Sequence, residues 1–301
     1  MFLIQNTNVG VDAGTLTLAG TIIPNGVAFN TDFRKVGGGT LVAQRFGGND
    51  VLGSPQRPLG LLEVSGGLLR QQQNPGVGPS TLTTSRVNAL SIQPFAQLDL
   101  TNNAMVIDYF GNSPQQDVRN ALRETRIISS TPNALSVGIG FGEQVDLASS
   151  FPTTTPNIFF GQSLDSTSLL LRYTLLGDTN LNGTVDFVDL VNLARSFNRP
   201  GVWTNGDSNY DGNVDFIDLV NIARNFNRTL GAPGPIGGLD AGGGASFEAE
   251  WARALAIVPE PTALGSLIGA GFALLRRFRR NSDKLLSENR LASARVAKYY
   301  V

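Results

Sequence analysis

The chain has 301 residues with 35 glycines and only 16% charged residues, a composition that argues against a compact helical enzyme and favours repetitive β structure. It contains no cysteine and no histidine, which excludes disulfides, thiolate and imidazole metal sites, and catalysis that needs a thiol or an imidazole. The formal net charge is -1, but residues 276–301 carry eight basic and two acidic side chains, +6 in total, so the rest of the chain carries -7 and suits a calcium ion better than nucleic acid.

Short alternating segments bounded by glycine or asparagine fill residues 1–110 and indicate β-strands. The predicted strands are Gly14–Gly20, Gly38–Gln44, Leu61–Leu69, Ala89–Gln93 and Ala96–Leu100. A glycine-rich turn followed by Thr-Leu or Leu returns at irregular intervals of roughly 20 to 25 residues, a spacing typical of solenoid coils. We expect a right-handed parallel β-solenoid, and the alternative is a β-sandwich with long loops. Because Met1 is not followed by the basic and apolar pattern of a signal peptide, we also expect this region to be truncated at its amino terminus.

Residues 111–176 are expected to form a helix and capping strands. The helix is predicted over Ser113–Arg123, with Ser113 as N-cap and Pro114 at the first helical position. Leu135–Gly142 and Ser168–Leu176 are predicted strands that close the β region, because an open sheet edge invites pairing with other chains. The succession of a stretch such as Ala96–Tyr109, a short helix and a pair of similar loops resembles autotransporter-like and planctomycete-type surface proteins.

Two twelve-residue loops, Asp178–Asp189 and Asp207–Asp218, align without a gap, and fifteen of the 22 positions of Asp178–Arg199 recur in Asp207–Arg228. Calcium takes about six to eight oxygen ligands, and loops of this length supply them from positions 1, 3, 5, 7 and 12, with position 9 often acting through water. Two Ca²⁺ ions are therefore predicted. The predicted ligands are Asp178, Asn180, Asn182, Thr184, Asp186 and Asp189 in the first loop, and Asp207, Asn209, Asp211, Asn213, Asp215 and Asp218 in the second.

Glycine stands at the sixth position of both loops, Gly183 and Gly212, where a sharp turn needs a positive φ. Val185 and Val214 follow and are expected to point into a small apolar core, and the residues after each loop have helical spacing. A single Asp-Asn-Gly cluster would more often be an ordinary turn, but two gapless copies favour a metal site. No helix precedes either loop, and aspartate rather than glutamate occupies position 12. The pair therefore resembles a type I dockerin rather than an EF-hand.

The resemblance implies that residues 177–230 bind a partner through equivalent residues in the two copies. These are Phe187, Val188, Arg195 and Arg199 in the first copy and Phe216, Ile217, Arg224 and Arg228 in the second. The apolar pairs Phe187–Val188 and Phe216–Ile217 stand where many cellulosomal dockerins have hydroxyl pairs, which argues against a standard cohesin partner. The expected partner is a cohesin-like protein or a cell-surface polysaccharide. The alternative is that both phenylalanines pack inside the module.

The carboxyl-terminal part begins with a Gly/Pro-rich linker, residues 231–257. Residues 258–280 resemble a PEP-CTERM sorting signal, which is recognised by an exosortase-type processing enzyme: Val258, Pro259, Glu260 and Pro261 precede an apolar run and then Arg276 and Arg277. The run Thr262–Leu275 spans about 21 Å, short of a roughly 30 Å bilayer, so we expect a transient anchor in the inner membrane. Residues 281–301 form a basic tail. The protein is expected to be exported and to be located at the cell surface or in the extracellular space.

These features predict a non-catalytic surface or matrix protein. The alternative is a polysaccharide-processing enzyme, a glycoside hydrolase or lyase on a β-helix that carries a dockerin. The acids available to such an enzyme are Asp99, Asp108, Glu143, Asp146 and Asp165. They are scattered along the sequence without a grouping of basic or aromatic residues, so solvated surface carboxylates are the simpler interpretation.

Overall fold

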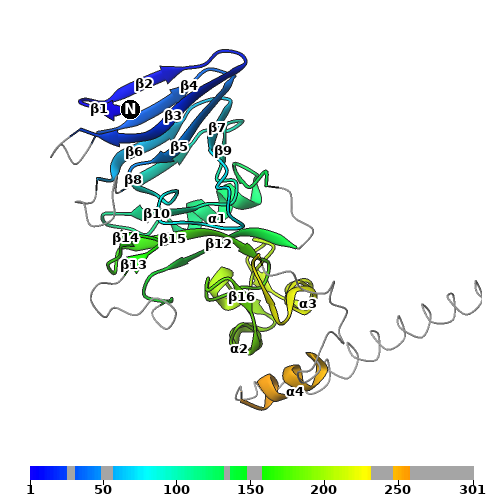
Figure 1. The fold of residues 1–301 in the computed structure, drawn as a ribbon. Coiled ribbons are helices and arrows are strands. Elements are labelled where there is room, and N and C mark those ends of the chain that lie inside the picture. The colour runs from blue at the N-terminus through cyan, green and yellow to red at the C-terminus, as the bar shows by residue number, and fades with distance from the viewer. Residues whose placement is uncertain (26–30, 49–56, 132–135, 148–157, 232–246, 258–301) are drawn as a thin grey trace, which may run out of the picture. The chain divides into compact units, whose positions relative to one another are not determined.

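The computed structural model describes residues 1–25, 31–48, 57–131, 136–147, 158–231 and 247–257. The fold is mainly β: a β-solenoid of about four turns leads into capping strands and a small helical module (Figure 1). Residues 1–254 form one compact unit. The predicted solenoid is confirmed, and the sandwich alternative is wrong, because the coil strands pair in parallel in both sheets.

Each coil contributes one strand to each of two sheets, so odd-numbered and even-numbered strands alternate. The first sheet has the order β1 (Phe2–Leu3), β3 (Thr15–Pro24), β5 (Thr40–Phe46), β7 (Leu68–Gln71), β9 (Gln97–Asp99) and β11 (Ile127–Ile128). The second sheet begins with β2 (Thr7–Gly10), β4 (Phe33–Val36), β6 (Leu59–Val64), β8 (Ser85–Ile92) and β10 (Ala104–Asp108). It ends with β15 (Ser168–Leu175) and β12 (Val137–Glu143), which pair antiparallel.

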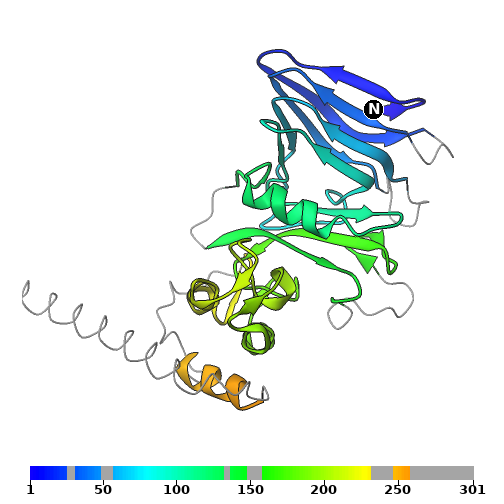
Figure 2. The same ribbon diagram turned by 180° about the vertical axis from the view of Figure 1, so that it is seen from behind.

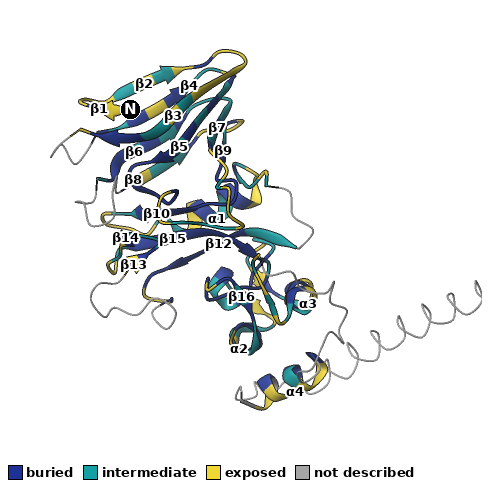
Figure 3. Cartoon of the chain, viewed as in Figure 1, coloured by how far each residue is buried: buried dark blue, intermediate teal, exposed yellow. Residues whose placement is uncertain are grey.

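The strand register gives the length of a coil. Leu41 pairs with Leu69, Leu69 with Leu98, and Leu98 with Ile127, which are steps of 28, 29 and 29 residues. These four side chains are buried and lie one above another from coil to coil. Figure 3 shows burial by element, with β10 and β15 almost entirely buried. The predicted interval of roughly 20 to 25 residues agrees with the first coils, in which Phe2 pairs with Ile23 and Thr15 with Thr40, and is too short for the later coils.

The segment Leu61–Leu69 was predicted as one strand but forms a corner between the two sheets. β6 ends at Val64 and β7 begins at Leu68. Gly67 has a φ of 60°, and a Cβ at this position would lie 2.4 Å from the carbonyl oxygen of Gly39 in the previous coil. Only glycine allows consecutive coils to approach this closely at the corner.

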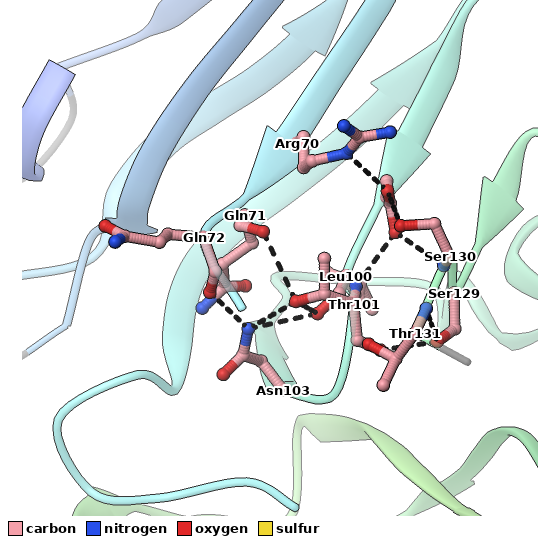
Figure 4. Close-up of polar contacts among 10 residues, drawn as sticks. Arg70, Gln71, Gln72, Leu100, Thr101, Asn103, Ser129, Ser130 and Thr131 are labelled. Carbon is pink, nitrogen blue, oxygen red and sulfur yellow. Dashed lines mark hydrogen bonds and ion pairs between the residues drawn. The ribbon is translucent and has the colours of Figure 1, made fainter. Parts of the chain in front are cut away.

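A buried aspartate ties three successive coils together at another corner (Figure 4). Asp99 accepts hydrogen bonds from the backbone N–H of Thr101 at 2.9 Å and of Ser130 at 3.0 Å, and from the Ser130 hydroxyl at 2.6 Å. Arg70 forms an ion pair with the same carboxylate at 2.7 Å. Asp99 is completely buried, so its role is to satisfy the polar groups of the corner.

Helix α1 (Gln115–Arg123) contacts β11 and β12 beside the last coil (Figure 2). Its N-cap is Pro114 rather than the predicted Ser113, so the helix begins one residue later than expected. The Ser113 hydroxyl accepts the N–H of Gln115 at 3.1 Å, and Pro114, with ψ near 10°, lies outside the helix. The two predicted capping strands are present as β12 and β15, and β13 (Ile158–Phe159) and β14 (Gln162–Ser163) form a hairpin between them.

The helical module consists of two copies of the same unit. Its helices are α2 (Phe187–Ser196) and α3 (Phe216–Asn225), and a short 3₁₀ turn, η1 (Trp203–Asn205), lies between the copies. The copies exchange strands: β16 (Thr184–Val185) pairs with β19 (Arg228–Thr229), and β17 (Arg199–Pro200) pairs with β18 (Asn213–Val214). The second half of each loop therefore pairs with the residues that follow the helix of the other copy.

The predicted linker 231–257 is wrong for its last part, because Phe247–Ile257 forms helix α4. Phe247, Trp251 and Ala254 recur at helical spacing and are buried. The Trp251 ring packs edge-on against Phe197 with centroids 5.7 Å apart, and Phe247 packs against Phe226 at 5.3 Å. Within the described ranges no helix is both long and apolar enough to cross a bilayer, and the predicted anchor lies outside these ranges.

Candidate metal centre

The second loop is shaped by hydrogen bonds from its own backbone to its polar side chains. Oδ2 of Asp207 accepts the N–H of Gly212 at 2.9 Å, and Gly212 has the predicted positive φ of 92°. Asn209 accepts the N–H of Asp211 at 2.9 Å, and Asp211 accepts the N–H of Asn213 at 2.8 Å. Such short-range bonds favour a tight turn over a helix or strand, so the local sequence itself specifies this loop.

Asp207 also has a buried oxygen that is not satisfied by the protein. The residue is fully buried, and its Oδ1 has no hydrogen-bond partner in the described part of the chain. The pKa of Asp207 is raised to about 7, chiefly by burial and also by the charges of Asp218 and Asp211, while the Gly212 hydrogen bond and the charge of Arg119 lower it. A buried polar atom without a partner costs about 1–3 kcal/mol, which a bound cation would offset.

The first loop has the same backbone turn, but both oxygens of its first carboxylate, Asp178, accept hydrogen bonds. Oδ1 of Asp178 accepts the N–H of Asn182 at 3.0 Å, and Oδ2 accepts the N–H of Gly183 at 2.8 Å and the hydroxyl of Thr174 on β15. Burial raises the pKa of Asp178 to about 6, and Arg172 partly opposes this shift. The two loops therefore have the same backbone turn, but of their first residues only Asp207 has a carboxylate oxygen without a hydrogen-bond partner in the described part of the chain.

Positions 9 and 12 of each loop start the following helix. Asp186 and Asp215 are the N-caps of α2 and α3, and each forms a capping box with the aspartate three residues later. At the same time, Asp189 accepts the N–H of Thr179 at 2.8 Å, and Asp218 accepts that of Ser208 at 2.8 Å. Burial, together with the charge of Asp178, raises the pKa of Asp189 to about 7. These bonds close each loop onto its helix.

The fit of these residues to calcium rests on their mixed donors. Among the described residues no three carboxylates lie close enough together to hold a metal ion by themselves. Calcium also takes amide and backbone carbonyl oxygens, which both loops contain. The unsatisfied Oδ1 of Asp207 is the observation that fits a cation. Val185 and Val214 are buried as predicted.

The helical module (residues 177–230) packs against the body of the protein, the β region of residues 1–176, through a glycine face on β12. This contact was not predicted from the sequence. Gly138, Gly140 and Gly142 alternate along this strand and therefore share one face. A Cβ at Gly140 would lie 2.4 Å from Leu181 and 2.8 Å from Trp203. The signal was present in the period-two glycines of Val137–Glu143, which leave room for large side chains of a packed partner.

The fourth residue of each loop inserts into this interface. Leu181 and Tyr210 both have a positive φ, 56° and 65°, although neither is glycine. The Tyr210 hydroxyl donates to the carbonyl oxygen of Ile139 at 3.1 Å and accepts its N–H at 3.0 Å. The Tyr210 ring also stacks on Trp203, with centroids 5.7 Å apart. The loops are therefore an integral part of the body.

The predicted partner-binding residues lie mainly at the surface. Val188, Phe216 and Ile217 are 50%, 45% and 55% exposed. Phe187 is half-buried because Arg253 of α4 stacks on its ring, 4.7 Å from the centroid. Arg195, Arg199 and Arg224 are exposed, and Arg228 is half-buried. The two phenylalanines therefore do not form the core of the module. The predicted sorting residues Val258, Pro259, Glu260, Pro261, Arg276 and Arg277 lie outside the described residues.

Two of the candidate catalytic acids, Glu143 and Asp165, act on Tyr109, whereas Asp99 lies in the corner network. The Tyr109 hydroxyl donates to Glu143 at 3.0 Å, and Ser113 donates to the other oxygen of the same carboxylate. Burial raises the pKa of Glu143, and the charge of Asp146 adds to the shift. Asp165 acts electrostatically on Tyr109. Asp108, at the end of β10, is paired with Arg86 at 2.6 Å.

No protein-family model, curated protein or solved structure matches this chain. Its function is therefore inferred from the internal duplication and the geometry of the two loops.

Proposed function

We propose that this is a non-catalytic, exported protein of the cell surface or extracellular matrix. In this proposal residues 177–230 bind two Ca²⁺ ions in the manner of a type I dockerin and attach the chain to a cohesin-like protein or a cell-surface polysaccharide. The β-solenoid acts as the spacer that carries this module.

The observation that carries the proposal is the buried, unsatisfied Oδ1 of Asp207, at the first position of the second loop. It occurs in a loop that is duplicated without a gap and whose glycine turn repeats with φ values of 91° and 92°. A buried carboxylate with its pKa raised to about 7 gains from a divalent cation because the ion favours the charged form.

Calcium titration calorimetry on the full chain tests this proposal, because the module is packed into the body. We expect two binding events for the native chain. Asp207→Asn keeps the shape of the side chain but removes its charge, so the second-loop affinity should fall at least about 10-fold. Asp117→Asn, an exposed acid of α1, is the control and should bind as the native chain does. Absence of calcium binding to the native chain would refute the proposal.

Attachment is supported by the exposed apolar pair at the start of α3, Phe216 and Ile217, in the position where dockerins recognise partners. Binding of the calcium-loaded chain to purified cohesin-like domains and to cell-surface polysaccharide should weaken in a Phe216→Ser, Ile217→Ser double variant. An unchanged affinity would remove this surface from the proposal.

Export and transient anchoring rest on the sequence of residues 258–280. We expect the mature protein to lack Thr262–Val301 after processing by an exosortase-type enzyme. Mass spectrometry of native material checks this, and peptides from Leu285–Tyr300 in the secreted fraction would contradict it.

The alternative of a polysaccharide-processing enzyme has one observation in its favour, the raised pKa of Glu143, which a general acid requires. Both oxygens of this carboxylate accept hydrogen bonds from neighbouring hydroxyls, which gives it a structural role. Turnover of any polysaccharide by the purified chain that is lost in Glu143→Gln would establish the alternative.

A further inference from the structure

Two arginines from the body approach the two loops at equivalent positions. A Cβ on Gly183 would lie 2.4 Å from Nη2 of Arg172, and a Cβ on Gly212 would lie 2.5 Å from Nη1 of Arg119. Each glycine is the sixth residue of its loop. Arg172 belongs to strand β15 and Arg119 to helix α1, so their common placement is not a product of the internal duplication.

The two guanidinium groups are poorly satisfied by the body itself. Arg172 is only 8% exposed, donates to the carbonyl oxygen of Leu181 and lies over the ring of Phe160, 5.0 Å from the centroid. Its Nε and the buried Nε of Arg119 have no hydrogen-bond partner in the part of the chain that the structure describes. A buried charge is costly unless an opposite charge compensates it. The nearest compensation comes from the loops.

In each loop the glycine at position 6 lies between the guanidinium group and the aspartate at position 1, the first predicted ligand. Gly183 donates its N–H to Asp178 at 2.8 Å, and Gly212 donates its N–H to Asp207 at 2.9 Å. A guanidinium group that is separated from a carboxylate by a single glycine stabilises the charged carboxylate when no metal is bound. The same charge repels a divalent cation that binds to that carboxylate.

We propose that Arg172 and Arg119 are built-in counter-charges that set the calcium affinity of the two loops. Each stabilises its loop without metal and lowers the affinity of the loop for Ca²⁺. This inference rests on the proposed function, and it assigns affinity-determining residues outside the loops themselves.

Loss of the counter-charge should destabilise the metal-free protein but tighten Ca²⁺ binding. A residue with a purely structural role would weaken both, so the two measurements distinguish the roles. Arg119→Gln should lower the melting temperature of the full chain in chelator and tighten Ca²⁺ binding at the second loop about 10-fold. The first loop should be unaffected, and the second-loop binding event is identified as the one that weakens in Asp207→Asn. Arg119→Lys retains the charge and should bind Ca²⁺ with nearly native affinity. Arg123→Gln, an exposed arginine of the same helix, is the matched control.

Titration calorimetry with CaCl₂ and thermal melts in chelator give the decisive outcomes. If the native chain binds no Ca²⁺, both the proposed function and this inference fail. If the native chain binds Ca²⁺ but Arg119→Gln binds it equally or more weakly, only the inference fails. Arg172→Gln repeats the test at the first loop, and the half-buried Arg119 is decisive if the deeply buried Arg172 variant does not fold.

Discussion

Trp203 donates its indole N–H to the carbonyl oxygen of Asp178 at 2.6 Å, so a residue that precedes the second loop holds the first residue of the first loop. Both residues are buried, and Tyr210 of the second loop stacks on the same indole ring. The two loops therefore meet at one side chain, Trp203.

Trp203→Phe should destabilise the protein by about 1–3 kcal/mol, because the buried carbonyl of Asp178 loses its donor while most of the apolar contact is kept. Urea unfolding of the full chain measures this change. Phe110→Leu, at an exposed aromatic residue, is the control and should have little effect. A loss below about 0.5 kcal/mol for Trp203→Phe would show that the hydrogen bond does not stabilise the module.

Gly140→Ala should destabilise the junction of module and body by about 1–3 kcal/mol, because its Cβ would collide with Leu181 and Trp203. Gly10→Ala is the matched control on β2, since its Cβ would meet only Val36 at an ordinary 3.6 Å. Urea unfolding followed by tryptophan fluorescence compares the two variants. Equal stability of both would contradict the tight packing against β12.

The metal-free protein should lose stability as the pH rises. The pKa values of Asp178, Asp189 and Asp207 in the folded chain are about 6, 7 and 7, above their ordinary 3.8. The folded state therefore binds protons more tightly, and the stability that these acids contribute is complete below about pH 4 and is lost as the pH rises to about 7.

Melting scans in chelator should accordingly show a fall of about 5 °C between pH 5 and pH 7.5. Saturating Ca²⁺ should abolish this fall, because the ion binds the deprotonated carboxylates. A melting temperature in chelator that is constant or rises across this range would show that these acids are not buried as described.

Helix α4 should depend on its two aromatic contacts. Trp251→Ala removes the partner of Phe197, so the amide hydrogens of α4 should exchange with solvent at least about 10-fold faster. Glu248→Ala, at an exposed position of the same helix, is the control. Unchanged exchange in Trp251→Ala would mean that the packing on Phe197 does not hold the helix.

The loops were predictable from sequence because their determinants are local. Glycine at position 6, valine at position 8 and aspartate at positions 9 and 12 act within a few residues, and the turns, buried valines and following helices are confirmed. Whether a cation binds stays a prediction, as does the identity of any partner.

The second sheet of the solenoid was harder to predict because some of its strands carry charged residues. Lys35 on β4 is fully buried, and its Nζ donates to the carbonyl oxygens of Gly39 at 2.6 Å and Gly66 at 2.7 Å. Lysine usually indicates an exposed position, so the pattern of this strand is misleading without knowledge of the corner that satisfies it. Helix α4 was missed because the glycine-rich residues 231–245 precede it and made the whole segment resemble a linker, despite the helical spacing of Phe247 and Trp251.

The reversal of strand direction at β15 limits where the protein can change in length. Parallel coils present the same hydrogen-bonding edge to each neighbour, whereas an antiparallel strand presents a different pattern and ends the series. Removing or duplicating a unit of 28 or 29 residues upstream would change the stack by about 4.8 Å per coil. Chains with different numbers of coils would therefore differ in length while keeping an identical helical module at the capped end.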